Sequence, residues 1–255
     1  MKKFLALFLL TIIFAPFSAY AENSIKIGII GAIDVEVETL KNDAEISRKI
    51  TKAEMEFCEG KLGNIDVVIV KCGMGKVNAG ICVQMLVDIF NVTHVINTGV
   101  AGSLNNALNI GDVVVAVDAV QHDYDVTPIN FEKGEIPYTG LVAFNTDKKL
   151  REQAVNAAKK VAPSIQIVEG RICTGDQFIS TKEQKNKIIS SFGGDCCEME
   201  GGAIAQACYL NKIPFIIIRS ISDKADETET VDFKEFEAQT AKLCANITEY
   251  MIRNF

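Results

Sequence analysis

The sequence has few of the residues that build metal sites. Only two histidines, His94 and His122, occur in the 255 residues, and no C-x-x-C motif is present. Structural and catalytic zinc sites usually need three or four Cys, His or carboxylate ligands, often at short spacings. We therefore expect no metal, and nothing in the sequence indicates another cofactor.

Basic residues are outnumbered and scattered. The chain has 26 Lys and Arg against 33 Asp and Glu, a formal net charge of −7. Domains that bind nucleic acid usually carry clustered Lys and Arg, so we expect no nucleic-acid partner. Low-complexity segments are also missing and 48% of the residues are hydrophobic, which indicates one large folded domain.

Long apolar runs are missing except at the N-terminus. Lys2 and Lys3 precede the apolar run 4–17, and Ala19-Tyr20-Ala21 fits a cleavage site. We expect residues 1–21 to be a signal peptide and residues 22–255 to be the mature domain, exported to the periplasm or the extracellular space. The run is short for a bilayer span and contains Pro16, so an uncleaved anchor is the weaker alternative. After cleavage we expect no stable membrane span.

Eight cysteines in an exported protein raise the question of disulfides. Cys72, Cys82, Cys173 and Cys208 lie within apolar strand or helix patterns, where Cys commonly acts as a small buried hydrophobe. The spacing therefore favours buried thiols.

Short apolar runs alternate with segments of helical periodicity. Helices are expected at Val35–Leu40, Val77–Phe90, Lys148–Val161, Ala203–Leu210 and Phe233–Arg253. Strands are expected at Ile25–Ile30, Ile65–Val70, Val95–Thr98, Val113–Val117, Ile165–Cys173 and Phe215–Ile218. This alternation predicts an α/β fold: a single domain with a mixed, largely parallel sheet flanked by helices.

Four segments place polar residues or glycines where strands end, which is where such sheets bind ligands: 31–36, 97–102, 198–202 and 219–223. Each also has a structural interpretation. Glycines suit tight turns, Glu36 suits a helix N-terminus, and Glu198 and Glu200 suit a solvated helix start. Taken singly, none of these segments establishes a function.

Taken together and in order, they resemble one family. The motifs are IGIIGAIDVEVETL, GMGKVNAG, INTGVAGSL, IGDVVVAVDAVQHDYDVT, GDQFI, CEMEGGAIA and IIIRSISDKAD. They are similar to those of 5′-methylthioadenosine/S-adenosylhomocysteine nucleosidases, members of the nucleoside phosphorylase superfamily. The resemblance runs from about Lys26 to the C-terminus. It implies a nucleoside phosphorylase-like fold, a homodimer, and a small-molecule nucleoside substrate. The implied reaction hydrolyses the N-glycosidic bond of 5′-methylthioadenosine, S-adenosylhomocysteine or a related 5′-substituted adenosine and releases adenine.

The resemblance also implies roles for individual residues. Asp223 would be the general acid at purine N7, with Ser222 orienting its carboxyl group, and Glu36 would be the base that activates water. Glu200 would hold the ribose hydroxyls beside Met199. The remaining matches are Phe178 and the backbone of Ile179 for the purine, Arg219 near Glu36 and the water, Ile33 and Phe233 for the 5′ pocket, and Ile129 and Pro137 for the 5′ pocket of a neighbouring subunit.

One position departs from the family pattern. Val100 stands where some relatives have Ser, and Val has no hydroxyl to place near the attacking water. We expect slower turnover or a shifted substrate preference, with activity retained.

Two other functions stay open at this point. A purine nucleoside phosphorylase would use phosphate in place of water, although the mature chain has only Arg48 before Arg151 and Glu36 would face the phosphate. An exported nucleoside-binding protein without turnover would not need Glu36, Glu200 and Asp223 together. The sequence does not decide among the 5′ substituents.

Overall fold

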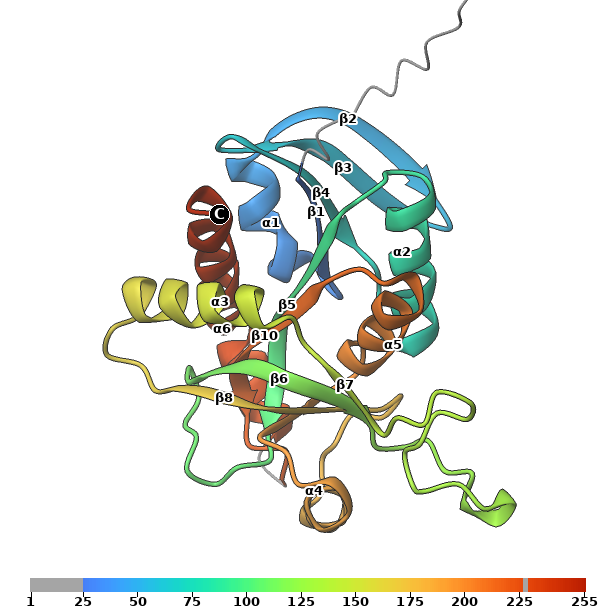
Figure 1. Cartoon of the computed structure of the whole chain (residues 1–255). Helices are drawn as coiled ribbons and strands as arrows, with labels where there is room; N and C mark the ends of the chain where they lie inside the picture. The colour runs from blue at the N-terminus through green and yellow to red at the C-terminus, as the bar shows by residue number, and fades with distance from the viewer. Residues whose placement is uncertain (1–24, 227–228) are drawn as a thin grey trace, which may run out of the picture.

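The computed structural model describes residues 25–226 and 229–255, so the expected signal peptide lies outside the described residues. Strand β1 (Lys26–Gly31) forms the centre of the first half of the sheet (Figure 1). It pairs in parallel with β4 (Ile65–Lys71) on one side and β5 (His94–Ser103) on the other. All three strands are largely buried, as expected for parallel strands covered on both faces.

The second half of the sheet closes on itself. Strand β5 pairs in parallel with β10 (Phe215–Asp223), and β10 pairs antiparallel with β6 (Val113–Gln121). Strand β6 runs parallel to β8 (Ile167–Thr174), and the short β9 (Cys196–Glu198) joins β8 back to β5. These five strands therefore form a closed barrel, to which β7 (Ala143–Asn145) adds an antiparallel pair with β6. The α/β class is confirmed, and the sheet is mixed.

A charged hairpin extends the open edge of the sheet. It consists of β2 (Glu45–Lys52) and β3 (Met55–Leu62), and β3 pairs antiparallel with β4. The turn between them places Ala53 and Glu54 at positive φ, as tight hairpin turns require. The sequence pattern does not indicate this hairpin, because β2 is an exposed edge strand with few apolar residues.

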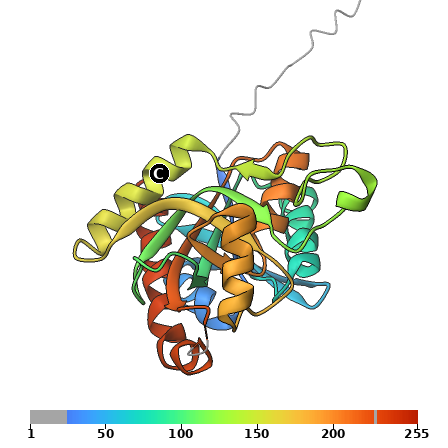
Figure 2. The same cartoon turned by 90° about the horizontal axis from the view of Figure 1, so that it is seen from below.

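Helices cover both faces of the sheet (Figures 1 and 2). One face packs against α1 (Asp34–Asp43), α3 (Lys148–Val161) and α6 (Glu229–Arg253). The other packs against α2 (Lys76–Asp88) and α5 (Gly201–Asn211). Helix α6 begins at Glu229, four residues before the helix start predicted at Phe233. The two residues before it, 227 and 228, lie outside the described residues.

A sixth helix, α4 (Lys182–Phe192), was not expected from the sequence. It packs Ile188 and Phe192 into a smaller core at the end of the barrel. Thr181 caps its N-terminus by accepting a hydrogen bond from the Gln184 amide at 3.2 Å. The loop that α4 follows carries two of the predicted site residues, Phe178 and Ile179, so the helix anchors this part of the site.

All eight cysteines are free and buried, including the four whose apolar surroundings favoured burial. Within residues 25–226 and 229–255, no helix is both long enough and apolar enough to cross a bilayer.

Candidate active site

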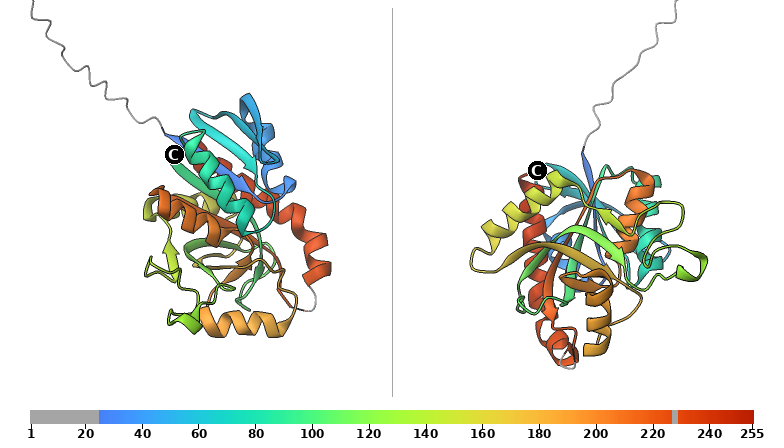
Figure 3. Two further views of the ribbon diagram at one scale, coloured as in Figure 1. Left: turned by 90° about the vertical axis from the view of Figure 1, so that its right-hand side faces the viewer. Right: turned by 60° about the horizontal axis from the view of Figure 1, so that its bottom comes forward.

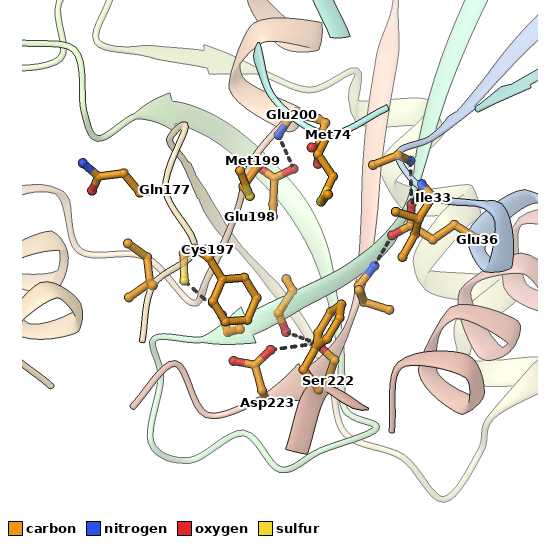
Figure 4. Close-up of a pocket in the computed structure, with 17 residues that line it drawn as sticks. Ile33, Glu36, Met74, Gln177, Cys197, Glu198, Met199, Glu200, Ser222 and Asp223 are labelled. Carbon is orange, nitrogen blue, oxygen red and sulfur yellow. Dashed lines mark hydrogen bonds between the residues drawn. The ribbon is translucent and has the colours of Figure 1, made fainter. Parts of the chain in front are cut away.

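A cavity opens where β1, β5 and β10 end, beside the loops that follow β8 and β9 (Figure 4). Nine of the ten predicted site residues line it, and Arg219 is the exception. The lining consists of Ala32, Ile33, Glu36, Met74, Val100, Ala101, Gly102, Gln177, Phe178, Ile179, Cys197, Glu198, Met199, Glu200, Ser222, Asp223 and Phe233. Segments that are up to about 200 residues apart in sequence thus meet at one place, as the resemblance implied.

Glu36 lies in the first turn of α1 and points into the cavity rather than to solvent, being 4% exposed. One carboxylate oxygen accepts hydrogen bonds from the amides of Ala32 (2.6 Å) and Ile33 (3.1 Å). The other accepts from the amide of Val100 at 2.9 Å. Burial raises the pKa of Glu36, while the charge of Arg219 and the three amides oppose that rise. A carboxylate held in this way is a fixed and strengthened base.

The backbone of β5 must come close for this arrangement. A Cβ atom on Gly99 would lie 2.3 Å from the nearer Glu36 oxygen. Glycine at this position is therefore required by the close approach of Glu36, and turn formation alone does not explain it.

Asp223 ends β10 on another side of the cavity from Glu36 (Figure 4). It is 3% exposed and accepts hydrogen bonds from the Ser222 hydroxyl at 2.8 Å and from the Ala225 amide at 2.9 Å. The Ser222 hydroxyl thus holds the Asp223 carboxyl group through a hydrogen bond. A Cβ atom on Gly102 would approach Asp223 to 2.7 Å, so this glycine also makes room for a carboxyl group.

Glu200 is the residue that caps the start of α5, and it too is buried, at 5% exposure. Its Oε1 accepts a hydrogen bond from the Gly75 amide at 2.8 Å. Burial, followed by the charge of Glu198, raises the pKa of Glu200 to about 8, against the opposing charge of Arg219. The interpretation of Glu198 and Glu200 as a solvated helix start is therefore wrong.

Arg219 lies beneath the cavity and is 2% exposed. Its Nη2 donates to Glu198 at 2.6 Å and to the Asn97 side-chain oxygen at 2.5 Å. Burial alone would lower the pKa of Arg219, but the three surrounding glutamates raise it. Arg219 therefore acts on the cavity through a fixed positive charge, although its side chain does not line the cavity.

Glu198 was not identified as a site residue from the sequence. Besides the Arg219 ion pair, it accepts hydrogen bonds from the amides of Glu200 (3.1 Å) and Gly201 (2.7 Å). The Thr174 hydroxyl donates to its other oxygen. The motif CEME carries the signal, because Glu198 and Glu200 are two residues apart in it. The partners of Glu198, Thr174 in β8 and Arg219 in β10, are seen only in the folded chain.

Most of the remaining cavity lining is apolar. Phe178 is 48% exposed, and its ring meets Phe233 edge-to-face with 5.7 Å between centroids. Ile33, Ile179 and Met199 complete the apolar lining. Ile129, which is 63% exposed, and Pro137 belong to the loop between β6 and β7 and do not line the cavity.

The cavity combines four carboxyl groups with apolar walls, and the buried guanidinium of Arg219 acts on three of them, Glu36, Glu198 and Glu200. Within the described part of the chain, no group of three or more Cys, His, Asp or Glu is placed to hold a metal ion. Such a site suits a neutral ligand that develops positive charge better than an anion.

Comparison with known proteins gives a consistent result. The sequence pattern of the phosphorylase superfamily matches residues 26–253. A 5′-methylthioadenosine/S-adenosylhomocysteine nucleosidase of an Exiguobacterium species is 40% identical over 88% of this chain and 97% of its own length. The nucleosidase of Bacillus subtilis is 38% identical over 85% and 93%.

Solved structures agree. The Neisseria meningitidis nucleosidase in complex with methylthio-immucillin-A superposes with a TM-score of 0.87 and 33% identity, covering 90% of this chain and 99% of its own. Futalosine hydrolase of Helicobacter pylori superposes with a TM-score of 0.86 and 31% identity, covering 91% and 98%.

Proposed function

The chain belongs to the phosphorylase superfamily, among its 5′-methylthioadenosine/S-adenosylhomocysteine nucleosidases, and from this premise we propose how its cavity carries out the reaction. The enzyme is a purine nucleosidase. It hydrolyses the N-glycosidic bond of 5′-methylthioadenosine, S-adenosylhomocysteine or a related 5′-substituted adenosine and releases adenine. The observation that carries the mechanism is the pair of buried carboxyl groups, Glu36 and Asp223, on different sides of one cavity.

The two carboxyl groups divide the work. The bond between C1′ and N9 breaks with its electron pair going to the purine, and Asp223 donates a proton to N7 so that neutral adenine leaves. This role requires Asp223 to carry a proton when the nucleoside is bound. On the other side, Glu36 takes a proton from the water that attacks C1′. The same division between acid and base operates in glycoside hydrolases.

The other residues hold the substrate. Glu200 accepts hydrogen bonds from the ribose hydroxyls and Met199 packs beside the sugar. Phe178 stacks on the purine, which the backbone of Ile179 meets through hydrogen bonds. Ile33 and Phe233 line the region that takes the 5′ substituent, and apolar side chains there suit a thioether. Arg219 acts from beneath the cavity by balancing the charge of Glu36.

The charges of the cavity disfavour phosphorolysis. Glu36, Glu198 and Glu200 converge on Arg219, which already binds Glu198 at 2.6 Å. A phosphate placed there would meet uncompensated carboxylates. Adenine release should therefore proceed at the same rate with and without phosphate, yielding the free sugar. A phosphate-dependent rate that yields a sugar 1-phosphate would overturn this choice.

Carboxyl-to-amide variants test the mechanism. Asp223→Asn and Glu36→Gln should each lower kcat for adenine release by about 10²–10⁴-fold, the usual contribution of one acid–base group. Asp34→Asn is the matched control, because Asp34 lies in the same helix turn as Glu36, is 75% exposed and pairs with Lys71. Full activity in either of the first two variants would rule out the assigned division of work. Wild-type protein that binds the nucleoside without releasing adenine would show it to be a binding protein.

The homodimer is also a proposal, supported by exposed apolar side chains on one side of the molecule. On α2, Val77 is 72% and Ile81 is 41% exposed, and on α5, Leu210 is 61% exposed. The loop with Ile129 and Pro137 projects from the body beside α5, where it could reach a neighbouring subunit (Figure 3). Light scattering should give twice the mass of the mature chain, and Leu210→Glu should shift it towards the monomer. A wild-type protein that stays monomeric at micromolar concentration would exclude this assembly.

Export is proposed from residues 1–21 alone. Mass spectrometry of the protein purified from its native host should find Glu22 as the first residue, in the periplasmic or extracellular fraction. An intact N-terminus in the cytoplasmic fraction would refute the proposal.

A further inference from the structure

Three charged residues near the cavity connect three segments of the chain through hydrogen bonds. Lys76 begins α2, Asp123 follows β6, and Asp176 follows β8. The Lys76 ammonium donates to Asp123 at 2.6 Å, and the Lys76 amide donates to Asp176 at 2.8 Å. The Asp176 amide in turn donates to the second Asp123 oxygen at 2.9 Å. The three residues therefore form a closed ring of hydrogen bonds, which we call the clasp.

The clasp is more protected than an ordinary surface ion pair. The side chains of Lys76 and Asp123 are each 17% exposed, whereas those of the surface pair Lys61–Asp66 are 53% and 38% exposed. Although partial burial opposes it, hydrogen bonds from Lys76 and from the Asp176 amide hold the pKa of Asp123 below its usual range. Asp123 is thus a fixed anion, and charge-assisted bonds of this kind are stronger than neutral ones.

Each end of the clasp leads directly to a residue that lines the cavity. Gly75, which precedes Lys76, donates its amide to Glu200 at 2.8 Å. Gln177 and Phe178, which follow Asp176, line the cavity. Gly75 has a φ of 97°, and a Cβ atom there would lie 3.1 Å from the Asp176 carboxylate. The direction of the Gly75 amide thus depends on the backbone conformation at Gly75. The clasp holds Lys76, the next residue along the chain, and so fixes that conformation.

We propose that Lys76, Asp123 and Asp176 are positioning residues that hold the ribose-binding Glu200 and the purine-binding loop 177–179 in one fixed relation. The clasp keeps the Gly75 amide on Oε1 of Glu200, so that Oε2 stays directed at the ribose hydroxyls. It also fixes the start of the purine loop. The inference rests on the proposed function, because it takes the roles of Glu200 and Phe178 from there.

A comparison of two substrates tests the clasp. Asp123→Asn keeps the shape of the side chain and removes its charge. For 5′-methylthioadenosine, we expect kcat/KM to fall about 10-fold, mainly through KM, which is the size expected from loss of a charge-assisted hydrogen bond. For the 3′-deoxy analogue, whose missing hydroxyl cannot contact Glu200, the fall should be no more than about threefold. Lys76→Arg, which keeps the charge, should retain more activity than Lys76→Met.

The control is Lys61→Met, which breaks a pair of the same type in the β3–β4 hairpin, and it should change neither substrate's kinetics. An equal loss on both substrates in Asp123→Asn would show that the clasp is merely structural and would overturn the proposal. Should Asp123→Asn fail to fold, the same substrate ratio is read in Lys76→Met, with the same two outcomes. Failure of the proposed function looks different, because wild-type protein would then release no adenine from 5′-methylthioadenosine.

Discussion

Removal of Glu198 should destabilise the enzyme far more than removal of a partly exposed glutamate with a similar partner. Glu198 is the counter-ion of Arg219 at 2.6 Å, and the two side chains are 3% and 2% exposed. Glu198→Ala would leave a buried guanidinium without its carboxylate, and would also remove the acceptor for the amides of Glu200 and Gly201. Breaking a buried pair from one side typically costs about 3–5 kcal/mol. The loss is mainly the cost of an uncompensated buried charge.

The matched control is Glu59→Ala. Glu59 also binds a cation, Lys26, at 2.7 Å, but the two side chains are 22% and 25% exposed. Ion pairs with this much water contact usually contribute about 0–1 kcal/mol. Equilibrium urea unfolding of both variants, at one protein concentration because of the proposed dimer, measures the difference. If the two variants lost the same free energy of unfolding, burial would not control the strength of these pairs and the electrostatic reasoning about the cavity would be wrong.

Three further predictions concern the cavity and the thiols. Val100→Ser should raise kcat or change the preference among 5′ substituents by about 2–10-fold, which is the range of one neutral hydrogen bond. Val100→Ala is the control for side-chain size. Unchanged kinetics in Val100→Ser would show that the hydroxyl has no role. Because the pKa of Glu200 is raised from 4.5 to about 8, unfolding free energy should fall as pH rises through this window, by up to about 5 kcal/mol at about 1.36 kcal/mol per pH unit. Urea unfolding of Glu200→Gln should show a shallower fall, and an identical slope would contradict the assignment. Burial raises the pKa of the Cys196, Cys197 and Cys244 thiols, so a thiol reagent should react only slowly with the native protein. The same reagent should titrate eight thiols after unfolding. Dithiothreitol should leave Tm unchanged.

The sequence predicts those parts of the fold that local patterns encode. The strands β1, β5 and β10 each contain buried apolar residues, and the cavity residues Glu36 and Asp223 stand five residues after the end of the first and at the end of the last. A buried strand flanked by polar residues is visible in any window of ten residues. Both the α/β class and the position of the cavity follow from such windows.

Long-range pairing was not predictable in the same way. Strand β9 has three residues, too few to show a period, yet it closes the barrel between β8 and β5. Glu198 ends β9 and contacts Arg219 in β10, and Lys76 and Asp123 are 47 residues apart. Periodicity carries no information on which charged side chains will meet across a closed sheet. Glu198 and the clasp therefore became visible only in three dimensions.

Three glutamates of the cavity share one buried neighbour of opposite charge, but their hydrogen bonds differ. Arg219 acts on Glu36, Glu198 and Glu200 alike. Glu198 pairs with Arg219 at 2.6 Å, and Glu36 accepts three amide hydrogen bonds. Glu200 has the Gly75 amide as a donor, and burial together with the neighbouring Glu198 raises its pKa to about 8. As the ribosyl group becomes positive, its attraction to the ionised form of Glu200 grows along the reaction path. Interactions that strengthen in this way lower the barrier rather than merely tighten binding.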